Sequence, residues 1–146
     1  MVQQLKWQLC TVVEIRQETP KAKSLILELP DWPTHLAGQH VDVRLTAEDG
    51  YQAQRSYSIA SPPGDKHLMI TVERIEAGEV SPYLTDGLRV GDRIELRGPI
   101  GGYFVWDARN GGTDGSTLFL AAGGSGSTPR AVMRAFTIST GSSAEK

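Results

Sequence analysis

The stretch that decides the fold is a strand at residues 55–61, Arg55-Ser56-Tyr57-Ser58-Ile59-Ala60-Ser61. The side chains of a strand alternate between its two faces, so Arg55 and Tyr57 share one face. Two prolines and a glycine at residues 62–64 end the strand and turn the chain. Arginine forms bidentate bonds to phosphate, and tyrosine offers a flat apolar ring with a polar tip. A ligand with a phosphate and a flat ring system would use both, although these residues alone fit a solvated arginine and a core tyrosine more readily.

Short segments of alternating apolar and polar residues flank this stretch. In residues 7–15 one face carries Trp7, Leu9, Thr11, Val13 and Ile15. The opposite face carries Gln8, Cys10, Val12, Glu14 and Arg16. This pattern predicts a half-buried strand. Further strands are predicted at residues 24–29, 39–46, 67–75, 92–98 and, briefly, 103–106. Short strands separated by a turn about every ten residues indicate an all-β antiparallel barrel or sandwich.

A short helix is predicted to begin at Ser81 and to be stopped by Gly87. Serine is a favoured N-cap, and the proline that follows it is favoured at the first helical position. Gly78 opens the turn before this helix and would let the backbone approach a ligand. The unpaired N–H groups and partial positive charge of a helix N-terminus suit a phosphate.

A second turn has the same design. Residues 123–129 are Gly123-Gly124-Ser125-Gly126-Ser127-Thr128-Pro129. Each of the two turns alone could simply start a helix. Together with Arg55 they give three candidate phosphate contacts, and the second turn lies where mononucleotide-binding α/β units place theirs.

The sequence pattern changes after residue 107. Residues 108–116 are polar and rich in glycine, which is typical of a linker. Residues 117–122 are apolar on both faces, as in a buried parallel strand, and a helix is predicted at residues 130–136. We therefore expect a barrel domain at 1–107, a linker at 108–116 and, at 117–146, only the first strand, turn and helix of an α/β nucleotide-binding domain.

Composition excludes several kinds of function. The 146 residues carry 15 basic and 17 acidic side chains, which gives no electrostatic case for binding nucleic acid or a membrane surface. Cys10 is the only cysteine and is expected to be an inert packed thiol, and the three histidines lack metal-ligand spacing, so no metal site is predicted. No segment is long and apolar enough to span a bilayer, and the cytoplasm is the expected location.

The chain resembles the ferredoxin–NADP reductase-type flavoproteins from about residue 9 to residue 136. The motifs that carry the resemblance are Arg55-Ser56-Tyr57-Ser58, Gly78-Glu79-Val80-Ser81, Gly98-Pro99-Ile100-Gly101 and the glycine turn at 123–129. The resemblance implies a six-stranded Greek-key barrel with one short helix that binds FAD, or less often FMN. A nicotinamide-nucleotide domain would follow the barrel, with NAD(P)H as co-substrate.

The resemblance also implies roles for single residues. Arg55 and Ser56 would contact the flavin, with Arg55 on its phosphate, while Tyr57 would pack on the isoalloxazine ring and Ser58 would lie near its N5 position. The remaining implied flavin contacts are Val72, Gly78, Val80, Ser81 and Thr128. The implied NAD(P) contacts are Gly123, Gly124, Gly126 and Thr128. Strand alternation points the Ser58 side chain away from Tyr57, so its contact needs a local twist or the backbone.

Two departures from the family's pattern bear on activity. Ser127 replaces the usual apolar residue before Thr-Pro, and the family's later Cys-Gly-Pro segment is absent. We therefore expect an FAD-dependent oxidoreductase domain with weak or no NAD(P)H activity alone, served by an electron-acceptor protein or by a chain that completes the second domain. One alternative is a cofactor-free, reductase-like barrel that acts as an interaction module. An oligonucleotide-binding barrel is a weaker third possibility.

Overall fold

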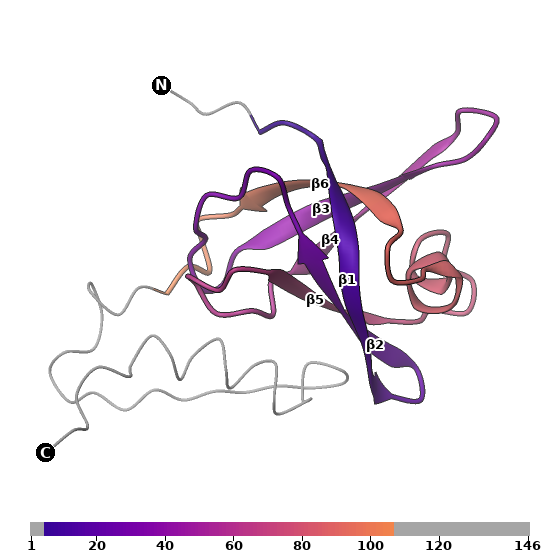
Figure 1. Ribbon diagram of the computed structural model, residues 1–146, viewed down its shortest axis with the longest axis horizontal. Helices are drawn as coiled ribbons and strands as arrows, with labels where there is room; N and C mark the ends of the chain where they lie inside the picture. Colours follow the sequence, from indigo (N-terminus) through magenta and orange to yellow (C-terminus); the bar gives the residue numbers. More distant parts are fainter. Residues whose placement is uncertain (1–4, 107–146) are drawn as a thin grey trace, which may run out of the picture.

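Six antiparallel strands and one short helical segment form the part of the protein that the computed structural model describes, residues 5–106 (Figure 1). In chain order the elements are β1 (Gln8–Thr19), β2 (Ala22–Glu28), β3 (His40–Thr46), β4 (Gln52–Ser58), β5 (Leu68–Glu73), η1 (Tyr83–Gly87) and β6 (Arg93–Ile100). The strand order is β4-β3-β6-β1-β2-β5. Because β6 pairs with both β3 and β1, the order departs from the chain sequence as a Greek key requires.

The sheet closes on itself just beyond the end of β4. Ile59 forms a bridge with Ile70 of β5, and the amide of Ala60 donates to the carbonyl of Met69 at 2.7 Å. This closure confirms the predicted barrel. Within the described residues, β4 itself pairs only with β3. The strands β4 and β5 therefore pair with each other only at this closure point.

Alternating residues fill the barrel as predicted in most strands. In β5 the inward residues Leu68, Ile70 and Val72 are buried, and in β3 Val41 and Val43 are fully buried. Residues of η1 complete the core, where Leu84 is fully buried. Burial of one face of β3 and β5 fixes the register of these strands.

The predicted faces of β1 are wrong in its first half. Cys10 and Val12 point into the core, and Leu9 is exposed. The register then shifts between Val12 and Glu14, as at a β-bulge, and Ile15 packs against the core beyond it. The Cys10 thiol donates to the carbonyl of Ile94, and burial raises the pKa of this thiol to about 12. Cys10 is therefore the inert packed thiol that the sequence suggests.

One charged side chain on the outer face of β3 is buried, although strand alternation would place it in solvent. Asp42 is buried, and its carboxylate accepts hydrogen bonds from Ser56, Gln54 and Arg97. The ring of Trp7 covers this surface, with the guanidinium carbons of Arg44 and Arg97 at 4.2 and 4.7 Å from its centre. A cation–π layer therefore shields part of the sheet from water.

Two of the predicted elements differ from the structure, and the predicted bounds of the helical segment agree with it. β6 continues through Pro99 to Ile100, beyond the predicted end of this strand at residue 98. The expected strand at 103–106 is wrong, because within residues 5–106 this segment forms an isolated bridge between Trp106 and Ala37 and no ladder. The helical segment does begin at Ser81 and end at Gly87, although residues 83–87 have π-helical hydrogen bonding.

The expected linker and α/β unit, including the glycine turn at 123–129 and Thr128, lie outside the described residues. Within residues 5–106, no helix has the length and apolar character needed to cross a membrane. The same range holds no group of three or more side chains that could ligate a metal ion.

Candidate functional site

Strand β4 places Arg55 and Tyr57 side by side on one face, as the alternation predicts. Arg55 is paired with Val43 and Tyr57 with Val41, and both valines point into the core. Tyr57 packs against the core and is partly buried, whereas Arg55 reaches solvent. The ring is thus held by packing, and the guanidinium remains available to a ligand.

The guanidinium of Arg55 is oriented by two contacts. Its Nη1 donates to the carbonyl of Gln54 at 2.6 Å, and its Nη2 lies 3.0 Å from Oε2 of Glu79. Guanidinium has five N–H donors, so these contacts leave three of them for another acceptor. The ion pair joins β4 to the turn that precedes η1, and so the structure brings together two motifs that are separated in the sequence.

Hydrogen bonds to Ile75 shape the turn at residues 78–81. The amide of Gly78 donates to the Ile75 carbonyl at 2.8 Å, and the Ile75 amide donates to Oγ of Ser81 at 2.9 Å. The Ser81 hydroxyl is therefore committed to Ile75, and its predicted role as an N-cap is wrong. A Cβ at position 78 would lie 3.0 Å from Oγ of Ser81, so the tight turn favours glycine.

The turn leaves two backbone donors free. Val80 has its side chain in the core, and within residues 5–106 neither its amide nor that of Ser81 has a hydrogen-bond acceptor. Two free amides and a guanidinium are donors of the kind that bind phosphate oxygens. The donor set therefore fits a phosphate-bearing ligand that also has a flat ring for Tyr57.

Two of the other predicted contacts have side chains that are engaged elsewhere in the barrel. The Ser56 hydroxyl donates to Oδ1 of Asp42 at 2.7 Å on the opposite side of β4. The Val72 side chain is fully buried in the core, so a ligand contact there would involve its main chain. Ser58 is exposed at the end of β4, before the closure of the barrel. The four predicted contacts in the second turn are outside the described part of the chain.

The phenol of Tyr57 stays neutral at physiological pH. Burial raises its pKa above the usual value of 10, and the positive charge of Arg55 acts in the opposite direction. A neutral phenol beside a cation adds no charge that would repel a phosphate.

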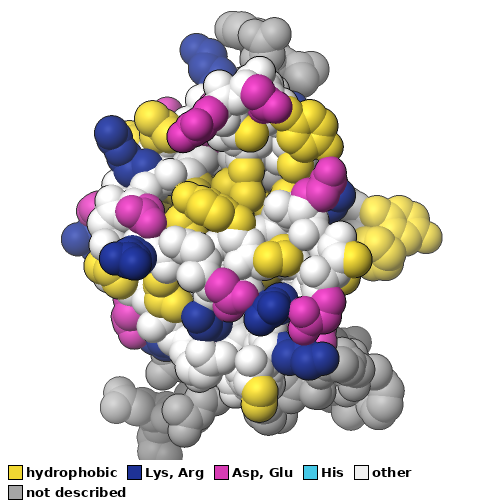
Figure 2. Space-filling view, turned by 90° about the vertical axis from the view of Figure 1, so that its right-hand side faces the viewer, with side chains coloured by type: hydrophobic (Ala, Val, Ile, Leu, Met, Phe, Trp, Pro, Cys, Tyr) yellow, Lys and Arg dark blue, Asp and Glu magenta, His cyan; other side chains and the backbone are white. Residues whose placement is uncertain are grey.

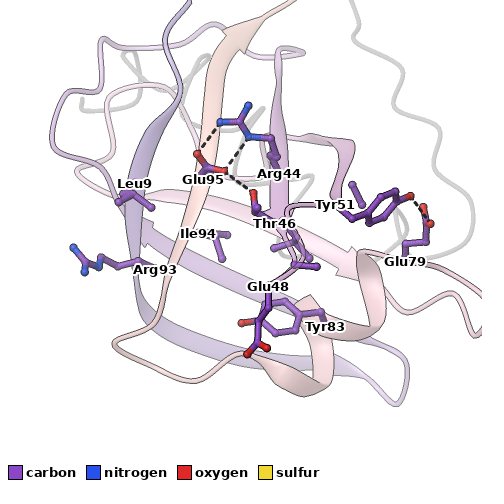
Figure 3. Close-up of a pocket in the computed structure, with 13 residues that line it drawn as sticks. Leu9, Arg44, Thr46, Glu48, Tyr51, Glu79, Tyr83, Arg93, Ile94 and Glu95 are labelled. Carbon is purple, nitrogen blue, oxygen red and sulfur yellow. Dashed lines mark hydrogen bonds and ion pairs between the residues drawn. The ribbon is translucent and has the colours of Figure 1, made fainter.

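Two residues of the site were not predicted. Glu79 accepts a hydrogen bond from the hydroxyl of Tyr51 at 2.8 Å (Figure 3), and its other oxygen pairs with Arg55. Counting back from Tyr57 in steps of two leads through Arg55 and Ala53 to Tyr51, and this periodicity could have identified the tyrosine. Glu79 could have been noticed as an acidic residue inside a turn assigned to phosphate.

Beside these residues lies a hollow of about 780 Å³ at the end of the barrel that carries the β3–β4 hairpin and η1. Its lining includes Leu45, Tyr51, Ala53, Glu79 and Tyr83. Figure 2 shows apolar side chains within a hollow on this side of the molecule, with acidic and basic side chains around it.

The family profile described as "Oxidoreductase FAD-binding domain" matches residues 9–105. DmpP, the reductase component of phenol 2-monooxygenase from Pseudomonas sp. (strain CF600), is 34% identical over 117 residues, which are 79% of this chain and 31% of that protein. The flavohemoprotein of Chromobacterium violaceum is 34% identical over 137 residues, which are 87% of this chain and 33% of that protein.

Among solved structures, the Amycolatopsis cytochrome P450 reductase GcoB superposes with a TM-score of 0.74 at 29% identity, and the match covers 92% of this chain and 38% of GcoB. The chain thus spans about a third of the length of the curated relatives it matches. The relatives support the flavin function and give no support to a cofactor-free interaction module. With a profile match over most of its length and the described barrel, the chain belongs to the oxidoreductase FAD-binding domains of the ferredoxin reductase-type flavoproteins.

Proposed function

We propose that FAD binds across β4 and the turn at residues 78–81. Arg55 holds the flavin phosphate, and the free amides of Val80 and Ser81 bind the pyrophosphate. Tyr57 supports the isoalloxazine ring, and Ser58 lies near its N5 position. The observation that carries this proposal is the 3.0 Å ion pair between Arg55 and Glu79, which places the arginine against the turn that has free amides. When bound, the flavin supplies the hydride and electron-transfer chemistry.

The protein's own contribution is orientation. The Gln54 carbonyl restricts the guanidinium of Arg55 before any ligand arrives, whereas the carboxylate of Glu79 occupies an N–H donor that a phosphate would use. Packing against the core restricts the ring of Tyr57. Such preorganisation lowers the entropy lost on binding. Ser56 and Val72 contribute through the main chain of β4 and β5, because their side chains are engaged elsewhere.

We further propose that the bound flavin passes electrons between NAD(P)H and an acceptor protein. Several relatives are themselves named as reductase components, among them DmpP and the reductase subunit of an aromatic O-demethylase. Thr128 and the glycines at 123, 124 and 126 are the proposed NAD(P) contacts, and the proposed location is the cytoplasm. A chain that completes the nicotinamide site is a second proposed partner.

The visible absorption spectrum of the purified chain tests flavin binding, with the released cofactor identified by chromatography. We expect a yellow protein that releases FAD, or a colourless one that becomes yellow and binds stoichiometrically when FAD is added. A chain that stays colourless with added FAD or FMN would contradict the proposal.

Stopped-flow mixing with NADH tests the nicotinamide step separately. The rate at which NADH bleaches the bound flavin measures this positioning, since poor positioning of two reactants can reduce a rate by many orders of magnitude. Fast, saturable bleaching would show that this chain positions the nicotinamide unaided.

A further inference from the structure

We propose that the adenine base of FAD binds against the ring of Tyr51, and that this residue lets the chain distinguish FAD from FMN. The inference rests on the proposed role of Arg55 as a phosphate ligand. It adds a binding residue at the opposite end of the site from Tyr57.

The order of residues along the chain supports this position. Tyr51 directly precedes β4, and its carbonyl accepts a hydrogen bond from the amide of Ala47 at 2.8 Å, which continues the hairpin pairing. The positions of Tyr51, Arg55 and Tyr57 differ by even numbers of residues, so their side chains follow one another along one side of an extended segment. In FAD the order is flavin ring, phosphates, adenosine. With the ring at Tyr57 and a phosphate at Arg55, the adenosine continues toward Tyr51.

Side-chain contacts bring the phosphate residues directly to Tyr51. Glu79 belongs to the turn with the free amides, and its two oxygens bind Arg55 and the hydroxyl of Tyr51 separately. The distances are 3.0 Å to the arginine and 2.8 Å to the tyrosine, and Figure 3 shows the contact with the tyrosine. A pyrophosphate on this turn thus has Tyr51 as its immediate aromatic neighbour.

The aromatic surface at this end is accessible. Tyr51 is 57% exposed and Tyr83 is 47% exposed, and both line the hollow of about 780 Å³. Large exposed aromatic rings beside a hollow offer the flat apolar face on which a nucleotide base stacks. Tyr57 in contrast is partly buried and packed against the core.

The charges on the side of the hollow that carries the tyrosines favour a base over a further phosphate, while Arg93 lies on the other side beside Leu9 (Figure 3). Glu48 lines it next to Tyr83 (Figure 3), and Glu95 is already paired with Arg44 at 2.7 Å. Carboxylates repel a phosphate but accept hydrogen bonds from an amino group. Adenine carries such an amino group and no charge, so the base is the part of FAD that suits this end.

Titration calorimetry of the full 146-residue chain with FAD and with FMN tests the proposal. Tyr51→Ala should weaken FAD binding about tenfold, because base–aromatic stacking contributes roughly that factor or more. The same variant should leave FMN binding unchanged, since FMN has no adenine. Tyr51→Phe keeps the ring and should bind FAD within about twofold of the parent chain.

Each contrary result has a distinct meaning. Equal FAD affinity in the parent chain and Tyr51→Ala, or an equal loss for FAD and FMN, would overturn the role of Tyr51. A loss in Tyr51→Phe as large as in Tyr51→Ala would overturn stacking and assign the effect to the hydroxyl. Failure of the parent chain to bind either flavin would overturn the proposed function itself. Val90→Ala, at an exposed position beyond η1, serves as the control and should bind both flavins normally.

Discussion

The guanidinium of Arg55 and the carboxylate of Glu79 form an ion pair of 3.0 Å between β4 and the turn before η1. Both side chains are about half exposed, so the pair adds little to the stability of the fold. The pair matters for ligand binding, because the carboxylate of Glu79 lies where it contacts the arginine that we assign to the flavin phosphate. A bound phosphate and Glu79 compete for the same guanidinium.

Replacing Arg55 by alanine should weaken FAD binding by roughly 1.5–3 kcal/mol, because a charge-assisted hydrogen bond to phosphate is lost. Calorimetric titration of the flavin-free chain measures this change. FMN binding should fall by a similar amount, since FMN carries the same phosphate. The control is Arg89→Ala, which removes an exposed arginine from the loop after η1. Unchanged FAD affinity in Arg55→Ala would refute the assigned role.

Replacing Glu79 by glutamine should strengthen FAD binding, up to about fivefold. The change removes a negative charge next to the pyrophosphate and ends its competition for Arg55, and an exposed ion pair is worth about 0–1 kcal/mol. The affinity gain should shrink as salt concentration rises, because exposed charges are screened. Weaker FAD binding in Glu79→Gln would mean that the carboxylate positions Arg55 for the ligand.

The strand pattern of the sequence predicted most of this fold and the centre of the site. In residues 68–73 every second residue is a leucine, isoleucine or valine, and this predicted inward face is buried in β5. Period two also placed Arg55 and Tyr57 on one face. These predictions succeed because a one-residue slip would expose a whole hydrophobic face to water.

The failures concern interactions between segments far apart in the chain. The bulge near Val12 reverses the expected faces of β1, and both possible faces of that strand contain apolar residues. The hydroxyl of Ser81 binds the Ile75 amide, which no local helix-capping rule reveals. The partnership of Glu79 with Tyr51 and Arg55 depends on the packing of the turn against β4. Local periodicity carries none of this information.

Asp42 should stabilise the barrel far more than a surface carboxylate does. Its side chain is 8% exposed and pairs with Arg97 at 2.7 Å. Asp42→Asn should lower the free energy of unfolding by about 1–3 kcal/mol, because Arg97 loses its charged acceptor in a partly buried site. Urea denaturation followed by circular dichroism measures the change. The matched control is Glu14→Gln, which breaks an exposed pair with Arg16 and should leave the urea midpoint unchanged.

Asp42 also makes stability depend on acid pH. Burial acts to raise the pKa of this carboxyl, but the hydrogen bonds from Ser56 and Arg97 outweigh it and lower the pKa below the usual 3.8. The stabilisation is present above the unfolded-state pKa and is lost as the pH falls through the folded-state value. In Asp42→Asn the urea midpoint should therefore change less below pH 4 than in the parent chain. Parallel curves for the two proteins would contradict this assignment.

His35 links the loop after β2 to the end of the flavin-binding strand. Its Nε2 donates to the carbonyl of Ser61 at 2.9 Å, and within residues 5–106 its buried Nδ1 has no partner. Burial lowers the pKa of this histidine below the usual 6.5, while the hydrogen bond to Ser61 and the charge of Asp65 act in the opposite direction. His35 is thus neutral in the folded protein at pH 7, with its proton on Nε2.

Stability should therefore fall as the pH drops below 6.5. In this range the unfolded chain binds a proton at His35 that the folded chain does not, so protonation favours unfolding until the pH passes the lower, folded-state pKa. We expect the thermal midpoint of the flavin-free chain to decrease between pH 7.5 and about pH 5.5. In His35→Gln the thermal midpoint should decrease less over this pH range, even if its value at pH 7.5 differs from that of the parent chain. The control is His67→Gln, which should show the same decrease as the parent chain. Equal slopes in the parent chain and His35→Gln would show that the buried imidazole does not control the loss.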